Sequence, residues 1–109
     1  MKLNELISLA EFSPISISTP DREINGAYAG DLLSWVMGRA QADCAWITIM
    51  SNVNVLAVAT LADVGCVIFA EGVCPDDEMI SVAKEKEINL LSTSLPIYEA
   101  CVALGGALK

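Results

Sequence analysis

One long apolar stretch, from Ala45 to Ala70, constrains the fold of this chain more than any other feature. Within it there is a single charged side chain, Asp63. Runs rich in β-branched residues lie over 45–50 and 65–70, and such continuous apolar runs are typical of parallel strands covered on both faces. The residues between the two runs are apolar and long enough for a helix. We therefore predict two neighbouring buried strands joined by a helix that crosses one face of the sheet.

The N-terminal third predicts a helix, an edge strand and a short extended segment. Apolar residues recur at helical spacing over 2–10. Isoleucines alternate with serines over 12–18, which is typical of a strand. Pro14 lacks a backbone donor, so this strand is expected at an edge of the sheet. An extended segment follows over 24–29.

Three further helices and one strand complete the predicted fold. One helix is expected over 32–40, with Asp31 or Gly30 as its cap, and a second is expected after Pro75, with three acids in its first turn. A strand is expected over 89–92. The last helix is expected after Ser94, its cap, with Pro96 in its first turn. Alternating strands and helices favour an α/β fold, specifically a three-layer sandwich. We expect a mainly parallel or mixed sheet of about five strands flanked by helices, in a single domain over 1–109.

The charge balance argues against two classes of partner. The chain has a net charge of −8, six Lys and Arg residues and no histidine. Proteins that bind nucleic acid or anionic membranes use clustered basic residues, so we expect neither partner. The apolar run 53–70 is interrupted by Asp63 and Gly65, which argues against a membrane span. The N-terminus lacks a secretion-signal pattern, so the expected location is cytoplasmic.

The apolar content predicts a contact with a second copy. Hydrophobic residues make up 54% of the chain, which is much for the interior of a small domain. The predicted helix over 32–40 has a core stripe of Leu33, Val36, Met37 and Ala40. Leu32 and Trp35 widen the stripe beyond one face, which suggests a homodimer contact. The candidate contact residues are Leu32, Trp35, Val36 and Arg39. The alternative is that Trp35 packs under the N-terminal helix.

Polar side chains follow three of the predicted strands. In open α/β sheets, ligands bind beyond the carboxyl ends of the strands. Two of these loops offer hydroxyl and amide groups suited to an anion. The candidate ligand-binding residues are Ser51, Asn52, Asn54, Ser92, Thr93 and Ser94. Alternatively, these residues are ordinary helix caps. The third loop, over 71–77, is acidic and disfavours an anion.

The chain lacks the spacing patterns of common catalytic and metal sites. Its four cysteines, without a close pair or any histidine, fit no zinc or redox template, so no metal or cofactor is expected. Cys74 lies in a loop and is the one cysteine worth a reactivity test. The acids over 76–78 are typical of a solvated first turn of a helix. We therefore expect no enzymatic activity.

The order of segments resembles the DRTGG domain family. The likeness rests on the runs Gly26–Met37, Trp46–Ile49, Val55–Ala59, Gly65–Phe69 and Leu90–Thr93. The namesake Asp-Arg-Thr-Gly-Gly string is absent, and the nearest loop reads Ser-Asn-Val-Asn over 51–54. The resemblance implies a dimerising regulatory domain similar to the N-terminal domain of HPr kinase/phosphorylase.

Three hypotheses for function result. The first is a stand-alone, non-catalytic regulatory or interaction module that homodimerises and modulates a partner protein. The second is a sensor that binds a nucleotide or phosphorylated metabolite at the strand-end loops. The third and weakest is an enzyme that uses Cys74 with the neighbouring acids.

Overall fold

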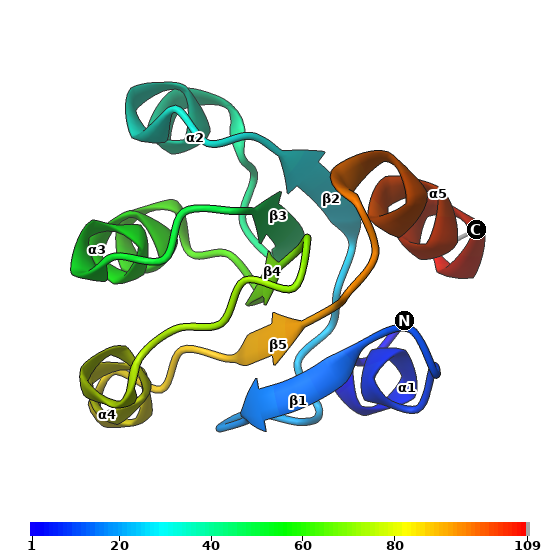
Figure 1. Cartoon of the computed structure of the whole chain (residues 1–109), viewed down its shortest axis with the longest axis horizontal. Coiled ribbons are helices and arrows are strands. Elements are labelled where there is room, and N and C mark those ends of the chain that lie inside the picture. The colour runs from blue at the N-terminus through cyan, green and yellow to red at the C-terminus, as the bar shows by residue number, and fades with distance from the viewer. Residues whose placement is uncertain (109) are drawn as a thin grey trace.

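A five-stranded mixed sheet forms the centre of the molecule, and helices cover both of its faces (Figure 1). The computed structural model describes residues 1–108. The strand order is β1-β5-β4-β3-β2, and all neighbours are parallel except β1, which runs antiparallel to β5. The strands are β1 (Ser13–Ser16), β2 (Gly26–Ala29), β3 (Cys44–Thr48), β4 (Cys66–Phe69) and β5 (Leu90–Ser92). The predicted α/β class is confirmed.

The helices lie in two layers, as predicted for a three-layer sandwich. Helices α2, α3 and α4 cover one face, and α1 and α5 cover the other (Figure 1). The helices are α1 (Leu3–Ile7), α2 (Leu33–Arg39), α3 (Val53–Ala62), α4 (Asp77–Glu85) and α5 (Ile97–Ala107). Within residues 1–108, none of them combines the length and apolar character that crossing a bilayer requires.

The neighbouring interior strands β3 and β4 contribute side chains to the core on both faces of the sheet. Every residue of β3 and β4 is buried. Trp46 and Phe69 pack toward α2, α3 and α4, whereas Ile47 and Ile68 pack toward α1 and α5, because successive side chains of a strand point to opposite faces. Burying each such side chain contributes about 1.5–3 kcal/mol. The predicted strand–helix–strand unit over Ala45–Ala70 is confirmed, with α3 as the connecting helix.

The two edges of the sheet differ. Strand β1 forms one edge, as Pro14 predicts, and its register with β5 is irregular between Pro14 and Ser16. Strand β2 forms the other edge and pairs with β3. From the sequence, this segment was predicted only to be extended. The order of the strands makes it an open edge with no charge and no proline.

The predicted cap of α2 is wrong. The N-cap position is Leu32, and it makes no side-chain hydrogen bond. The carboxylate of Asp31 instead accepts hydrogen bonds from the hydroxyl of Thr48 at 2.7 Å and from the N–H of Ile49 at 2.9 Å. Asp31 therefore joins the end of β2 to the end of β3 rather than stabilising the helix start.

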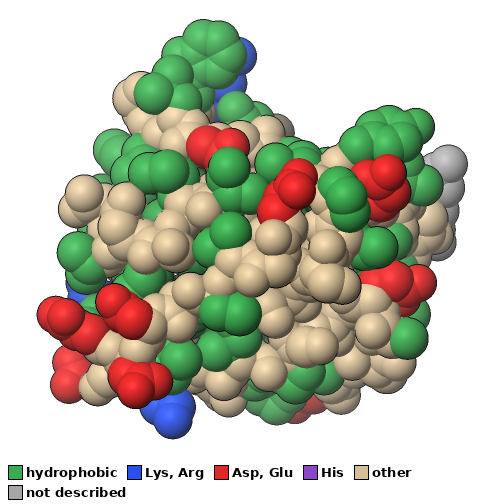
Figure 2. Space-filling view, in the orientation of Figure 1, with side chains coloured by type: hydrophobic (Ala, Val, Ile, Leu, Met, Phe, Trp, Pro, Cys, Tyr) green, Lys and Arg blue, Asp and Glu red, His purple; other side chains and the backbone are tan. Residues whose placement is uncertain are grey.

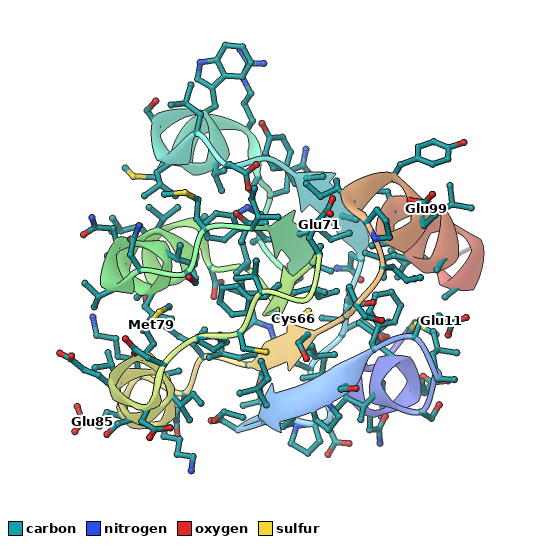
Figure 3. The ribbon with its side chains drawn as sticks, in the orientation of Figure 1. Glu11, Cys66, Glu71, Met79, Glu85 and Glu99 are labelled. Atoms are coloured by element: carbon teal, nitrogen blue, oxygen red, sulfur yellow. The ribbon has the colours of Figure 1, made fainter. Side chains whose placement is uncertain are left out.

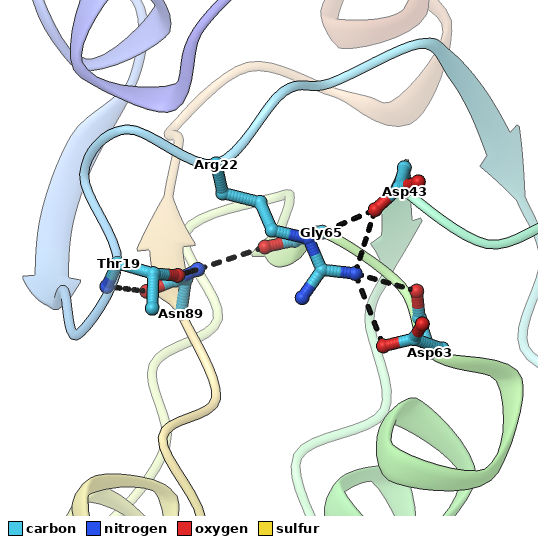
Figure 4. A network of polar contacts seen from close by, with 6 residues as sticks. All are labelled: Thr19, Arg22, Asp43, Asp63, Gly65 and Asn89. Carbon is cyan, nitrogen blue, oxygen red and sulfur yellow. Dashed lines mark hydrogen bonds and ion pairs between the residues drawn. The ribbon is translucent and has the colours of Figure 1, made fainter.

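At the opposite end of the sheet, the side chain of Asn89 links three segments (Figure 4). Its Oδ1 accepts hydrogen bonds from the N–H groups of Ser18 and Thr19, at 2.8 and 3.0 Å. Its Nδ2 donates to the Thr19 hydroxyl at 2.7 Å and to the Gly65 carbonyl at 2.9 Å. Asn89 is 2% exposed. The connection between β1 and β2 is thereby fixed against the starts of β4 and β5.

Asp63, the single charged residue of the apolar stretch, forms an ion pair with Arg22. The Nε of Arg22 donates to a carboxylate oxygen of Asp43 at 2.9 Å, and one of the Arg22 terminal nitrogens lies 3.1 Å from Asp63 (Figure 4). Both acids adopt a left-handed backbone conformation, with φ of 67° and 55°. Asp63 is the C-cap residue of α3. The three side chains therefore join two tight turns at the amino-terminal edge of the sheet.

Candidate functional site

The carboxyl ends of the four parallel strands meet at one edge of the sheet, where α2, α3, α4 and α5 begin. Figure 2 shows acidic side chains over α4 and across the middle of this face, and basic side chains at its margin. Anion-binding sites in this class of fold use the free N–H groups of the helix starts. A site of this kind therefore requires free N–H groups at the starts of these helices.

The chain's own side chains already occupy three helix starts. Asn52 accepts a hydrogen bond from the N–H of Asn54 at 3.0 Å, at the start of α3. Asp76 accepts one from the N–H of Met79 at 2.9 Å, at the start of α4. An external anion would have to compete with these caps, and near Asp76 it would also meet a like charge.

The start of α5 is occupied by a carboxylate from another loop. Its N-cap position is Pro96, not the predicted Ser94. The Glu71 carboxylate accepts a hydrogen bond from the N–H of Ile97 at 3.1 Å, and Figure 3 shows Glu71 near the first turn of α5. Glu71 and Gly72 both adopt left-handed conformations, with φ of 61° and 74°. Because Glu71 lies 26 residues from Ile97, sequence spacing gave no signal for this contact.

Five of the six candidate ligand-binding residues line two separate hollows. Ser51 and Asn52 line one of about 240 Å³ together with Asp76 and Glu78. Asn54 lies in the first turn of α3, where its N–H is bonded to Asn52. From the sequence, these residues and Ser92, Thr93 and Ser94 are expected to form one site. The structure separates them.

The second hollow has a volume of about 340 Å³ and lies at the end of β5. It is lined by Ala10, Glu11, Ser13, Gly72, Cys74, Ser92, Thr93, Ser94 and Leu95. Thr93 is 4% exposed, and its hydroxyl accepts a hydrogen bond from the N–H of Leu95 at 3.1 Å. Glu11 brings a negative charge to this hollow, and its lining contains no basic residue. Of the parts of a nucleotide, this lining suits the ribose hydroxyls and the base better than the phosphates.

Three of the four cysteines have thiols whose ionisation is disfavoured by burial. Burial raises the pKa of the Cys66 thiol to about 12, and burial also raises the pKa values of Cys44 and Cys101. Cys74 is exposed, and the acid nearest to it in the third hypothesis, Asp76, is used as a helix cap. Within residues 1–108, no group of three or more His, Cys, Asp or Glu side chains is placed to hold a metal ion.

Helix α2 presents an exposed apolar surface. Leu32 is 58% exposed and Trp35 is 52% exposed. The guanidinium of Arg39 lies 3.8 Å from the centroid of the Trp35 ring, which is a cation–π contact. Val36, a predicted contact residue, is fully buried and belongs to the core, whereas Met37, predicted for the core, is 51% exposed.

The alternative position for Trp35 is wrong. The N-terminal helix α1 lies on the opposite face of the sheet from α2 (Figure 1), so it cannot cover the indole. Helix α5 carries a second exposed pair, Tyr98 at 75% and Val102 at 57%. The spacing of i and i+4 places these two side chains on one face of the helix, and this spacing is visible in the sequence alone.

Comparison with known proteins identifies a related fold. No family model matches the chain, and no curated protein matches it. A solved structure of the CBS and DRTGG domains of the regulatory region of Clostridium perfringens pyrophosphatase, complexed with the activator diadenosine tetraphosphate, is similar to it with a TM-score of 0.64. The two are 16% identical, and the match covers 82% of this chain and 39% of that chain. The likeness establishes the fold and agrees with the fold that the DRTGG resemblance implied.

Proposed function

We propose that this chain is a DRTGG-like, non-catalytic regulatory module that acts through protein contacts, homodimerises and modulates a partner protein. The observation that carries the proposal is the exposed pair of Leu32, the N-cap residue of α2, and Trp35 within that helix. A large aromatic side chain that is half exposed beside leucine is typical of an interface. The regulatory region to which the fold is similar supports the regulatory class.

The electrostatics favour protein contact over anion binding. Two of the three occupied helix starts are closed by carboxylates, those of Glu71 and Asp76. The net charge of −8 adds a general repulsion toward phosphate groups. The apolar surface of α2 carries no such penalty.

The test is the mass of the protein in solution. We expect light scattering to give a dimer, and Trp35→Asp to convert it to a monomer, because the substitution places a desolvated charge in the interface. The matched control is Leu61→Asp, at an apolar residue of α3 that is 72% exposed. This control should leave the mass unchanged. A wild-type monomer at high micromolar concentration would contradict the proposal, and so would equal effects of the two substitutions.

A second candidate function is the sensing of a small ligand at the hollow after β5. The solved regulatory region binds a dinucleotide activator, and Ser92, Thr93 and Ser94 line a hollow here. A thermal-shift screen with adenine nucleotides, including diadenosine tetraphosphate, distinguishes the two functions. Stabilisation that is lost in Ser94→Tyr, which fills the hollow, would support the sensor. A flat response across the panel would reject it.

A further inference from the structure

We infer that the open edge of β2 pairs antiparallel with the same edge of a second copy, so that two sheets join across a two-fold axis. This inference rests on the proposed homodimer and states which surface forms it. The evidence is the hydrogen-bonding state of the edge, the apolar side chains on both faces beside it, and the charges at its two ends.

The N–H and C=O groups of Ala27 and Ala29 point away from β3, toward the open edge of the sheet. Strand β2 is aligned with β3, with Ala27 opposite Ala45, and the N–H of Gly30 donates to the carbonyl of Ile47 at 3.1 Å. Alternate residues of a strand direct their peptide groups to opposite sides. The even-numbered residues of β2 therefore bond to β3, and the two alanines present donors and acceptors at the open edge.

This edge lacks the features that usually prevent pairing between strands. Exposed edges are commonly protected by charged side chains, proline or irregular geometry. Strand β1 has two of these features, Pro14 and its irregular register with β5. Strand β2 consists of Gly-Ala-Tyr-Ala, and its two alanine side chains are exposed. Its small side chains allow another backbone to approach closely.

Apolar side chains flank this edge on both faces of the sheet. Figure 2 shows apolar groups projecting over α2 and over α5, with a recess between them. The residues are Leu32 and Trp35 on α2, and Tyr98 and Val102 on α5. A stable interface buries about 800 Å² of each partner, roughly a seventh of the 5574 Å² surface of this chain. A strand of four residues is too small to supply such an area alone, so the inference requires the exposed side chains of α2 and α5 to be covered as well.

The charges at the two ends of the edge are complementary under a two-fold axis. A hollow of about 290 Å³ runs along β2 and is lined by residues 25–28 and by Arg39, so this cation lies beside the start of the strand. Asp31 follows its end, and both of its hydrogen bonds toward β3 use the same carboxylate oxygen, Oδ1, which leaves the other oxygen for this contact. Antiparallel pairing places the start of one strand beside the end of the other. Arg39 of each copy then approaches Asp31 of its twin.

A second copy fits this edge better than an unrelated extended peptide does. Any extended segment can add to an open edge, but an unrelated peptide has no reason to match both the apolar flanks and the charges. The net charge of −8 opposes contact between copies over most of the surface. Strand β2 itself carries no charge, so pairing it with its twin brings no like charges directly together.

Amide hydrogen exchange at two protein concentrations tests the pairing on the unmodified chain. On going from dilute to concentrated protein, the N–H groups of Ala27 and Ala29 should exchange at least about tenfold more slowly, because dimerisation gives them hydrogen-bond partners. The N–H of Tyr28, which β3 already protects, should change much less. Equal exchange rates for both alanines at the two concentrations, in a protein that is dimeric at the higher one, would overturn the inference.

A proline substitution separates this inference from the proposed function. Ala27→Pro removes an outward N–H without removing a bond to β3, and proline is tolerated on edge strands. It should weaken the dimer at least about tenfold, since the two-fold axis duplicates each lost bond. Ala27→Ser keeps the N–H and should dimerise normally. If Trp35→Asp gives a monomer and folded Ala27→Pro remains a full dimer, the homodimer is supported. The pairing of the two β2 strands, which we call the β2 seam, is then wrong.

Discussion

The indole Nε1 of Trp46 donates a hydrogen bond of 2.9 Å to the carbonyl oxygen of Gly30. Trp46 is fully buried in β3, and Gly30 is the residue that follows β2. The bond fixes the end of the edge strand to the centre of the sheet. Since α2 begins at Leu33, soon after Gly30, the bond also restrains the chain that leads into α2.

Trp46→Phe should destabilise the protein by about 1–3 kcal/mol, because it removes this bond and leaves space in a packed core. Urea denaturation measures the free energy of unfolding. Tyr98→Phe is the control, because it also removes one polar group from an aromatic side chain but at a position that is 75% exposed. It should change stability by less than about 0.5 kcal/mol. Equal effects of the two substitutions would contradict the structural role of the Trp46 bond.

Asn89→Ala should cost about 2–4 kcal/mol, because the N–H groups of Ser18 and Thr19 and the carbonyl of Gly65 lose a buried partner. Thermal unfolding measures the loss. Asn54→Ala, at an exposed asparagine, is the matched control and should be close to neutral. A neutral Asn89→Ala would show that water or a local rearrangement replaces this network.

Stability should fall above pH 9 because of Cys66. Burial raises the pKa of this thiol from 9.0 to about 12, so it stays protonated in the folded chain while it ionises in the unfolded chain. The contribution of the protonated Cys66 thiol to the free energy of unfolding is fully present below pH 9. It is lost as the pH rises toward 12, by at most about 1.4 kcal/mol per pH unit. Between pH 8 and 10.5, wild type should lose about 2 kcal/mol more than Cys66→Ala. Parallel pH profiles for the two proteins would refute this.

Arg39→Glu should weaken the dimer by about three- to tenfold, because the substitution puts like charges at both ends of the β2 seam and removes the cation from the Trp35 ring. Sedimentation velocity over a concentration series measures the dissociation constant. Lys86→Glu changes the net charge by the same amount at the C-cap of α4. If it weakened the dimer equally, the effect would be one of net charge and not of position.

The sequence was sufficient to predict the core. Over Ala45–Ala70 the apolar pattern, the lengths of the runs and the helix between them all favour one arrangement, and β3, α3 and β4 have it. Pro14 likewise predicted an edge strand correctly. In these cases the determining forces are local or depend only on burial.

Features that depend on contacts between distant segments could not be predicted. Asp31 was expected to cap α2, but its carboxylate bonds to Thr48 and Ile49, which become neighbours only when β2 and β3 pair. Glu71 replaces Ser94 at the start of α5 for the same reason. The open edge of β2 follows from the strand order, which local patterns do not encode.

The most direct test of homodimerisation is the mass of the unmodified chain by sedimentation equilibrium from low to high micromolar concentration. A self-associating module with a β2 seam should approach twice the 11.5 kDa of one chain as the concentration rises. A constant mass of one chain across the whole range would contradict it.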